Sequence, residues 1–357
     1  MSEANCSVQL VTLAGGRGMR AVRLVSPSMC VDVLPDKGAD IYRIVHRATG
    51  VDVLWKSALG LRPLSEGWSS GESETAWLEH YEGGWQEILP HTGAPEKYKG
   101  VALSFHGEST LLPWSFEVVK DAGDEVSVDF SVTLFRSPFR LTRRMTINAA
   151  SSGFRLLERV TNMAGEPMDF VWGHHPAYGA PFLSEHARIH TNARTVFTDP
   201  SYDDPHCRTS PGVTTEWPYA KGKDGHQVDL RAVASERERN CLMAYLRDFD
   251  GAPWYAVTNA RSKLGIGLAW TPNAFRHLWL WQEMRASTGF PFYGRSYTMA
   301  LEPHSSYPHG LVNIMHTTKT HHSLEAGAVL EGELMFTMFE DASGDVKRVE
   351  LDGRVVR

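Results

Sequence analysis

The sequence lacks the segments by which membrane and secreted proteins are recognised. Across its 357 residues, no apolar run approaches the roughly 18 residues that a membrane-spanning helix needs. The first residues, Met1 to Ser7, contain neither the basic part nor the apolar part of a secretory signal. We therefore expect a cytoplasmic protein with no membrane partner.

Cysteine is scarce, and its spacing suits neither a metal site nor a disulfide framework. The cysteines are Cys6, Cys30, Cys207 and Cys241. They form no Cys-x-x-Cys pair and no zinc-like spacing with histidine. His321 and His322 are adjacent but have no third ligand motif nearby, so we assign them to a polar loop. The pattern predicts free thiols and no metal site.

The chain also has no excess of basic over acidic residues. The formal net charge is −6, and the Arg-rich stretch from Arg136 to Arg144 is short and strand-like. Nucleic-acid-binding domains carry a basic face, so we exclude nucleic acid as a partner and expect a neutral or polar small molecule. The hydrophobic content of 42% and charged content of 22% are those of an ordinary globular protein.

Alternation of apolar and polar residues with a period of two is the main pattern that is present. Such alternation is typical of half-buried strands, whereas no long segment has the 3.6-residue period of an amphipathic helix. The predicted strands are 7–12, 21–26, 30–34, 40–46, 126–135, 139–148 and 154–161. The sequence therefore predicts an all-β fold of antiparallel strands.

The chain shows no internal boundary. No linker, repeat or low-complexity segment divides it, so we predict one large β-sandwich domain over residues 1–357. Two smaller sandwiches that meet near Pro167 are the alternative. Residues 63–82 and 202–224 lack a strand pattern and are predicted to be long loops, which often carry function in compact β domains. Residues 235–240 are predicted to form at most one solvated helical turn.

Four short motifs combine histidine, glutamate or tryptophan with glycine or proline. They are Gly83-Gly84-Trp85-Gln86-Glu87, Phe105-His106-Gly107-Glu108, Trp172-Gly173-His174-His175-Pro176 and Leu301-Glu302-Pro303-His304. Glycine and proline favour strand ends, so we expect these side chains to converge at one rim of the sheet. Imidazole gives or takes a proton near neutral pH. The adjacent histidines are therefore the strongest indication of acid–base chemistry.

The order and content of these motifs resemble those of the aldose 1-epimerase, or galactose mutarotase-like, family. A Pro35-Asp36-Lys37-Gly38 motif precedes them, and the resemblance extends from Val31 to Pro308. It implies a large antiparallel β-supersandwich and an isomerase of carbohydrate metabolism that interconverts sugar anomers by general acid–base catalysis. It also implies that no cofactor is required and that the partner is a sugar or a modified sugar.

The resemblance assigns the general acid to His175, the general base to Glu302 and a contact with the sugar ring to His106. Opening a cyclic hemiacetal requires removal of the anomeric proton and delivery of a proton to the ring oxygen, which a carboxylate and an imidazolium do together. We expect Glu302 to be ionised and its charge to keep His175 cationic. Trp85 and Tyr178, inside or beside the motifs, are predicted to bind the substrate.

Gln282 is the remaining predicted binding residue. Alternation along Leu278-Trp279-Leu280-Trp281-Gln282-Glu283 places Gln282 opposite Trp281 and Glu283, and the sequence leaves open which set faces a cavity. The same rule places His174 on the opposite face from His175, where we expect a structural role.

One departure from the family restricts what the resemblance implies. Hexose mutarotases carry an arginine before the first histidine, whereas the Gly83-Gly84-Trp85-Gln86-Glu87 motif has none. The identity of the sugar, its anomer, any phosphate or sulfonate on it and the oligomeric state therefore stay open. Two other functions on this fold also stay open: non-catalytic sugar binding or sensing, and a sugar isomerase or lyase.

Overall fold

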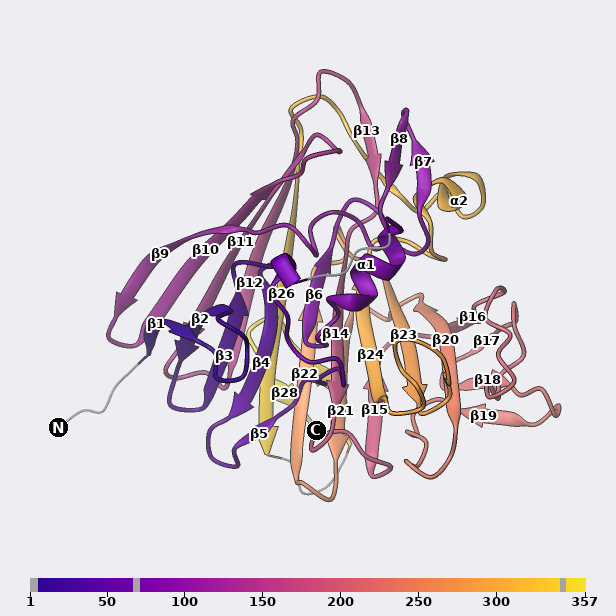
Figure 1. The fold of residues 1–357 in the computed structure, drawn as a ribbon. Coiled ribbons are helices and arrows are strands. Elements are labelled where there is room, and N and C mark those ends of the chain that lie inside the picture. The colour runs from indigo at the N-terminus through magenta and orange to yellow at the C-terminus, as the bar shows by residue number, and fades with distance from the viewer. Residues whose placement is uncertain (1–5, 67–70, 341–344) are drawn as a thin grey trace.

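Two large antiparallel sheets form the protein (Figure 1). The computed structural model describes residues 6–66, 71–340 and 345–357. The predicted segments 7–12, 40–46 and 139–148 are strands from end to end. Neighbouring strands of both sheets pair antiparallel. The prediction of an all-β, antiparallel supersandwich is therefore confirmed.

Within the described residues, the first sheet has 12 strands and the second has eight. The order of the first is β1 (Ser7–Thr12), β2 (Arg20–Val25), β3 (Met29–Leu34), β4 (Asp40–His46), β6 (Trp85–Ile88), β14 (Gly173–Gly179), β24 (Tyr297–His304), β23 (His277–Met284), β20 (Asn240–Arg247), β16 (Thr195–Thr198) and β17 (Thr214–Glu216), with β5 (Val51–Asp52) beside β4. The order of the second is β15 (Ala187–Thr191), β21 (Trp254–Asn259), β22 (Leu264–Trp270), β26 (Val329–Glu340), β12 (Gly153–Asn162), β11 (Phe139–Asn148), β10 (Glu125–Thr133) and β9 (Ser115–Ala122).

Short strand pairs and short helices surround these sheets. The strand pairs are β7 (Glu96–Tyr98) with β8 (Val101–Leu103), β13 (Met168–Phe170) with β25 (His322–Leu324), β18 (Tyr219–Lys221) with β19 (Gln227–Asp229), and β27 (Arg348–Val349) with β28 (Val355–Val356). The helices are η1 (Leu64–Glu66), α1 (Ser73–Glu79) and α2 (Leu311–His316). Among the described residues, no helix has the length and hydropathy to cross a membrane.

The main core lies between the two sheets. Trp85 of β6 packs against Phe154 of β12 and Phe336 of β26, with ring centroids 5.8 and 6.1 Å away. All three side chains are buried, and burial of a large apolar side chain stabilises a fold by about 1.5–3 kcal/mol. The contact between the sheets uses one face of β14 and β24, and α1 covers part of the other face (Figure 1), where Trp77 packs near Ala177 and Ala300.

Several local expectations are wrong. Residues 63–82, of which 67–70 lie outside the described residues, are no plain loop because they contain η1 and α1, and residues 202–224 contain β17 and β18. Helix α1 has only seven residues, too few to show a period, and such a short helix is stabilised by packing rather than by propensity. The prediction of at most one helical turn at residues 235–240 agrees with the structure, where residues 236–238 turn without a helix and Asn240 begins β20. His322 lies in β25, with Nε2 2.8 Å from the carbonyl of Ala274.

Candidate active site

One face of three neighbouring strands, β14, β24 and β23, carries the candidate active site. Alternation directs His175 of β14 and Glu302 of β24 to this face, and Trp279 of β23 pairs with Glu302 across the sheet. Nε2 of His175 lies 3.6 Å from Oε1 of Glu302. The Leu301-Glu302-Pro303-His304 motif ends β24 as expected, whereas the His174-His175-Pro176 motif does not end its strand, because β14 continues through Pro176 with β6 and β24 as its neighbours.

A cavity of about 390 Å³ opens on this face. His106, His175 and Glu302, which the resemblance places at the reaction centre, all line it. The rest of the lining is mainly aromatic and consists of Trp77, Tyr81, Phe105, Tyr202, Trp279, Trp281, Phe290 and Phe292 with Glu74, Leu78, Met243, Glu283, Ser287 and Pro291. Apolar walls around a few convergent polar groups are the usual form of a small-molecule site.

His106 reaches the cavity from the loop between β8 and β9. Its backbone has a φ of 53°, a left-handed conformation that costs a non-glycine residue free energy. The backbone N–H of Gly93 donates to Nδ1 of His106 over 3.2 Å. Because a backbone N–H can only donate, Nδ1 is the acceptor and the neutral ring carries its proton on Nε2. His106 is therefore a fixed N–H donor, packed edge-on against Trp77 with ring centroids 4.7 Å apart.

Tyr81, which follows α1, orients His175. Its hydroxyl lies 3.3 Å from Nδ1 of His175, and the two rings meet nearly at a right angle. Burial raises the pKa of the Tyr81 hydroxyl well above its usual value of 10, so this group keeps its proton and can either donate to Nδ1 or accept from it. When Nδ1 carries the proton of a neutral His175, Nε2, the nitrogen that faces Glu302, is free to take a proton. No sequence motif pointed to Tyr81, because it falls in a segment without strand pattern.

Glu302 also contacts the imidazole of His304. Nε2 of His304 lies 3.4 Å from Oε2 of Glu302, so His175 and His304 approach different carboxyl oxygens. The His304 ring stacks on Trp279, with 4.0 Å between centroids and 15° between planes. A Cβ atom at Gly173 would come within 2.2 Å of the same ring, which explains the glycine there. The spacing of Glu302 and His304, two residues apart on a strand, was the signal for a shared face.

Burial controls the protonation of Glu302 and His175. It raises the pKa of Glu302 well above the ordinary value of 4.5 and lowers the pKa of His175 to about 4. The expectation of an ionised Glu302 beside a cationic His175 is therefore wrong for this site. That expectation used pKa values of groups in water, whereas Glu302 is 2% exposed and His175 is 6% exposed. Burial therefore favours the neutral form of both groups, with the proton of the pair on Glu302 rather than on His175.

Two of the predicted binding residues lie in the core instead. The indole of Trp85 donates to Nδ1 of His174 over 3.0 Å, and the hydroxyl of Tyr178 lies 2.6 Å from that of Tyr255 in the second sheet. Neither Trp85 nor Tyr178 lines the cavity. Both point between the sheets for the same reason, because alternation sends them to the face opposite His175.

Gln282 also lies on the core face. It accepts a hydrogen bond from the side chain of Asn240 over 3.2 Å, while its neighbours Trp281 and Glu283 line the cavity. The Trp281 ring lies 5.7 Å from that of His175. The alternative that the sequence left open is thus decided in favour of Trp281 and Glu283, and the prediction for Gln282 is wrong.

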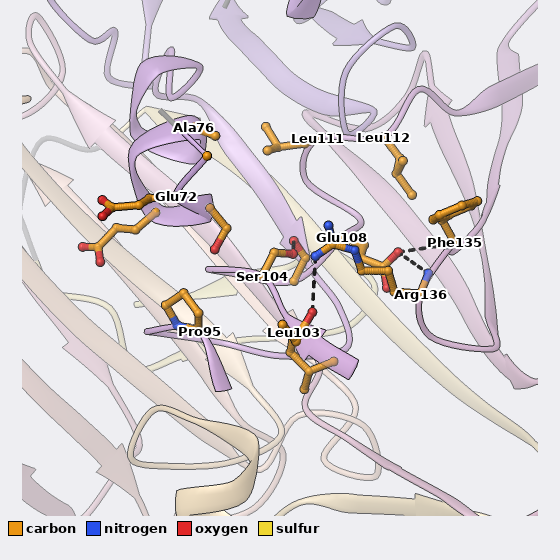
Figure 2. Close-up of a pocket in the computed structure, with 15 residues that line it drawn as sticks. Glu72, Ala76, Pro95, Leu103, Ser104, Glu108, Leu111, Leu112, Phe135 and Arg136 are labelled. Atoms are coloured by element: carbon orange, nitrogen blue, oxygen red, sulfur yellow. Dashed lines mark hydrogen bonds between the residues drawn. The ribbon is translucent and has the colours of Figure 1, made fainter. Parts of the chain in front are cut away.

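A larger hollow of about 950 Å³ adjoins the same loop and α1 (Figure 2). Its buried carboxylate, Glu108, accepts hydrogen bonds from the backbone N–H groups of Phe135 and Arg136, at 2.9 and 2.7 Å, and from the hydroxyl of Ser137 at 2.8 Å. Glu108 therefore holds the turn between β10 and β11. The described residues around this hollow include no histidine that could pair with a carboxyl group, so we place the site in the smaller cavity.

The opposite face of β14 carries a second set of buried ionisable groups, the core cluster, which consists of Glu87, Arg143, Glu158 and His174. Nε2 of His174 lies 2.9 Å from Oε2 of Glu158, and Arg143 donates to Glu87 over 3.2 Å. The ligand atoms of Glu87, Glu158 and His174 lie within 4.8 Å of one another, a spacing that a metal ion could bridge. Trp85 and Arg143 already donate hydrogen bonds to His174 and Glu87, which favours an ion-pair network over a metal site.

Comparison with known proteins identifies the family and the fold. The family model of a domain of unknown function, DUF4432, matches residues 16–337. Among solved structures, the chain is similar to a candidate aldose 1-epimerase from Klebsiella pneumoniae subsp. pneumoniae, with 19% identity, a TM-score of 0.70 and coverage of 94% of this chain and 84% of that one. It is also similar to a galactose mutarotase-like protein from Clostridium acetobutylicum, with 14% identity, a TM-score of 0.64 and coverage of 94% and 99%.

A galactose mutarotase related enzyme from Lactobacillus acidophilus is similar as well, with 13% identity, a TM-score of 0.59 and coverage of 91% of this chain and 99% of that one. No curated protein sequence matches the chain. At these identities the likeness concerns the fold, which is galactose mutarotase-like.

Proposed function

The chain belongs to the DUF4432 family, and we propose that it is an aldose 1-epimerase-like enzyme that interconverts sugar anomers in the cavity over β14, β24 and β23. The observation that carries this proposal is the approach of His175 to Glu302, 3.6 Å apart in a cavity that His106 also lines. That distance is longer than a hydrogen bond, so each group can engage a sugar hydroxyl when the substrate binds.

The proposed reaction moves one proton in each direction. A base takes the proton of the anomeric hydroxyl, an acid protonates the ring oxygen, and the bond between the anomeric carbon and the ring oxygen breaks. Rotation of the resulting aldehyde and closure on its other face give the second anomer. Glu302 and His175 share one transferable proton. The group that carries this proton is the acid, and the other group is the base. Each such group contributes about 10²- to 10⁴-fold.

The cavity walls favour an uncharged sugar. Aromatic side chains such as Trp77 and Trp281 are suited to pack against the C–H face of a sugar ring. The acidic lining residues are Glu74, Glu283 and Glu302, and no lysine or arginine occurs among the described residues that line the cavity. A phosphate or sulfonate group would lack the cationic donors that normally bind it.

A cytoplasmic location is part of the same proposal. All four cysteines are free thiols in the structure, as is usual in a reducing compartment.

Saturation-transfer NMR at anomeric equilibrium, over a panel of neutral aldoses and aldose phosphates, tests the activity. We expect exchange with an unphosphorylated sugar, and a loss of about 10²- to 10⁴-fold in Glu302→Gln with binding of that sugar retained. Glu158→Gln, the same substitution in the core cluster, is the matched control and should leave exchange unchanged.

Two outcomes would redirect the assignment. If Glu302→Gln exchanges anomers as fast as the wild type, Glu302 takes no part in proton transfer. Binding without exchange for every sugar would favour a binding or sensing protein. A product whose carbonyl group lies at a different carbon would favour an isomerase. A product with a new double bond would favour a lyase.

A further inference from the structure

Cys207 and Cys241 meet beside the candidate active site. Cys207 lies between β16 and β17, Cys241 is the second residue of β20, and the two form an isolated parallel β-bridge. They are 3% and 1% exposed, in a small cluster with Ala286 and Tyr202. Neighbouring strands lie about 4.8 Å apart, which falls within the roughly 4.4–6.8 Å between Cα atoms that a disulfide spans.

The surroundings divide the two thiols into a nucleophile and a partner. A hydrogen bond from Cys241 lowers the pKa of Cys207 to about 6, with help from Thr209, whose hydroxyl lies 3.2 Å from Sγ. The same hydrogen bond and burial raise the pKa of Cys241 above its ordinary value of 9. These surroundings therefore favour the thiolate form of Cys207, the reactive form of cysteine, and the protonated form of Cys241.

We propose that Cys207 and Cys241 are an oxidation site at which hydrogen peroxide closes an intrachain disulfide. The Cys207 thiolate attacks one peroxide oxygen, the O–O bond breaks, and a sulfenic acid and, after protonation, a water form. Cys241 then attacks the sulfenic sulfur, the S–O bond breaks, and the thiol proton leaves with the hydroxide as a second water. The two sulfurs lose two electrons in total, and the peroxide gains them.

The size of the local opening indicates the oxidant. A cavity of about 10 Å³, which is about the space that one water needs, is lined by Cys241, Asn240 and Thr209, and the Thr209 hydroxyl lies 3.2 Å from Sγ of Cys207. Hydrogen peroxide is close to water in size, whereas glutathione disulfide is far larger. Burial raises the pKa of Cys6 and of Cys30, so we expect both to remain thiols under the same treatment.

Tyr202 connects the two cysteines to the cavity of the candidate active site. Its side chain lines that cavity and packs against the cluster that contains Cys207 and Cys241. Cys241 is also the cross-strand partner of Glu283, another lining residue. A disulfide between Cys207 and Cys241 changes the positions of the two sulfurs in the cluster against which Tyr202 packs and therefore changes the wall of the cavity at Tyr202.

Peptide mass mapping of the folded wild-type protein tests the proposal. The protein is treated with hydrogen peroxide, alkylated with N-ethylmaleimide and digested. We expect a cross-linked pair of peptides that joins Cys207 to Cys241 and lacks two hydrogen atoms, with Cys6 and Cys30 alkylated. Treatment with a dithiol reductant before alkylation should restore both thiols.

Two serine variants separate the roles of the thiols. Cys241→Ser leaves the nucleophile without a partner, so we expect a sulfenic acid at Cys207 that dimedone traps. Cys207→Ser leaves only the thiol of raised pKa, so Cys241 should stay open to alkylation. The proposal is overturned if peroxide leaves the wild-type thiols alkylatable, or joins Cys207 to Cys241 only after unfolding in urea. None of these outcomes depends on whether the protein acts on a sugar.

Discussion

Two sets of buried ionisable groups lie on opposite faces of β14, and they differ in how completely the protein provides them with hydrogen-bond partners. The site cluster consists of His106, His175, Glu302 and His304. Its carboxyl group lies 3.6 and 3.4 Å from the imidazoles of His175 and His304. In the core cluster the corresponding hydrogen bonds are 2.9 to 3.2 Å long, and they include donors from Trp85 and Trp172.

The difference separates groups that hold the sheets together from groups that remain able to bind a ligand. In the core cluster Arg143 balances two carboxyl groups, and burial raises the pKa of Glu87 to about 7 and of Glu158 to about 8. The described lining of the cavity supplies the site cluster with no such cation. A buried polar group without a partner costs about 1–3 kcal/mol, and sugar hydroxyls are suited to complete the site cluster.

The largest expected effect comes from disrupting the site cluster. His175→Asn removes one member of the proton-transfer pair, so we expect anomer exchange to fall about 10²- to 10⁴-fold with little change in the thermal unfolding midpoint. Adding Glu302→Gln should cost less than the product of the single losses, because the two residues act as one unit. Saturation-transfer NMR measures the exchange. Losses that simply multiply would show that the residues act independently.

Disrupting the core cluster should affect stability instead. Arg143→Met leaves Glu87 buried without its cation, so we expect the free energy of unfolding to fall by about 3–5 kcal/mol. Arg144→Met is the matched control, because Arg144 pairs with Asp129 on the surface, and exposed pairs contribute about 0–1 kcal/mol. Urea unfolding measures both variants. Equal losses would remove the contrast between the buried and the exposed arginine.

A smaller effect is expected from His304, which contacts Glu302 but is not among the residues that line the cavity. His304→Asn should lower exchange on the order of tenfold and shift its pH profile, while sugar binding changes little. His174→Asn makes the same substitution on the core face and should reduce stability without moving that profile. An unchanged pH profile in His304→Asn would leave His304 with a packing role only.

A last effect, confined to a pH window, concerns stability. Burial raises the pKa of Glu158 from an ordinary 4.5 to about 8, so the folded protein binds this proton more tightly than the unfolded chain. The contribution of Glu158 to the free energy of unfolding is therefore fully present below about pH 4.5, and it is lost as the pH rises towards 8. Glu158→Gln should therefore flatten the decline in the free energy of unfolding across that window. Glu331→Gln, at an exposed carboxylate, should leave the slope unchanged.

Much of the architecture could be predicted because strand alternation is a local property. Segment 139–148 forms β11 from end to end, since each of its side chains alternates between core and solvent. The short helix α1 could not be predicted, because the packing of Trp77 stabilises it rather than any periodic pattern. Tyr81 could not be predicted either, because it follows α1 in the same segment without a periodic pattern.

The candidate site was predictable only in part. The motifs and their resemblance led to His106, His175 and Glu302, which the structure brings to one cavity, while their catalytic roles stay predictions. The predictions for Tyr178 and Gln282 were wrong, although both residues belong to strands that build the site, and so was that for Trp85 of the neighbouring strand β6. Their sequence neighbourhood was informative, but it carried no information on which strand face the cavity occupies.

By itself, the sequence determined the antiparallel β architecture and the relative faces of neighbouring residues, such as His174 and His175, because a period of two is set by the backbone. Only the tertiary structure decided which face meets the second sheet and which meets α1 and the cavity. It also decided the protonation of Glu302, since the pKa of a carboxyl group depends on how completely the surrounding chain removes it from water.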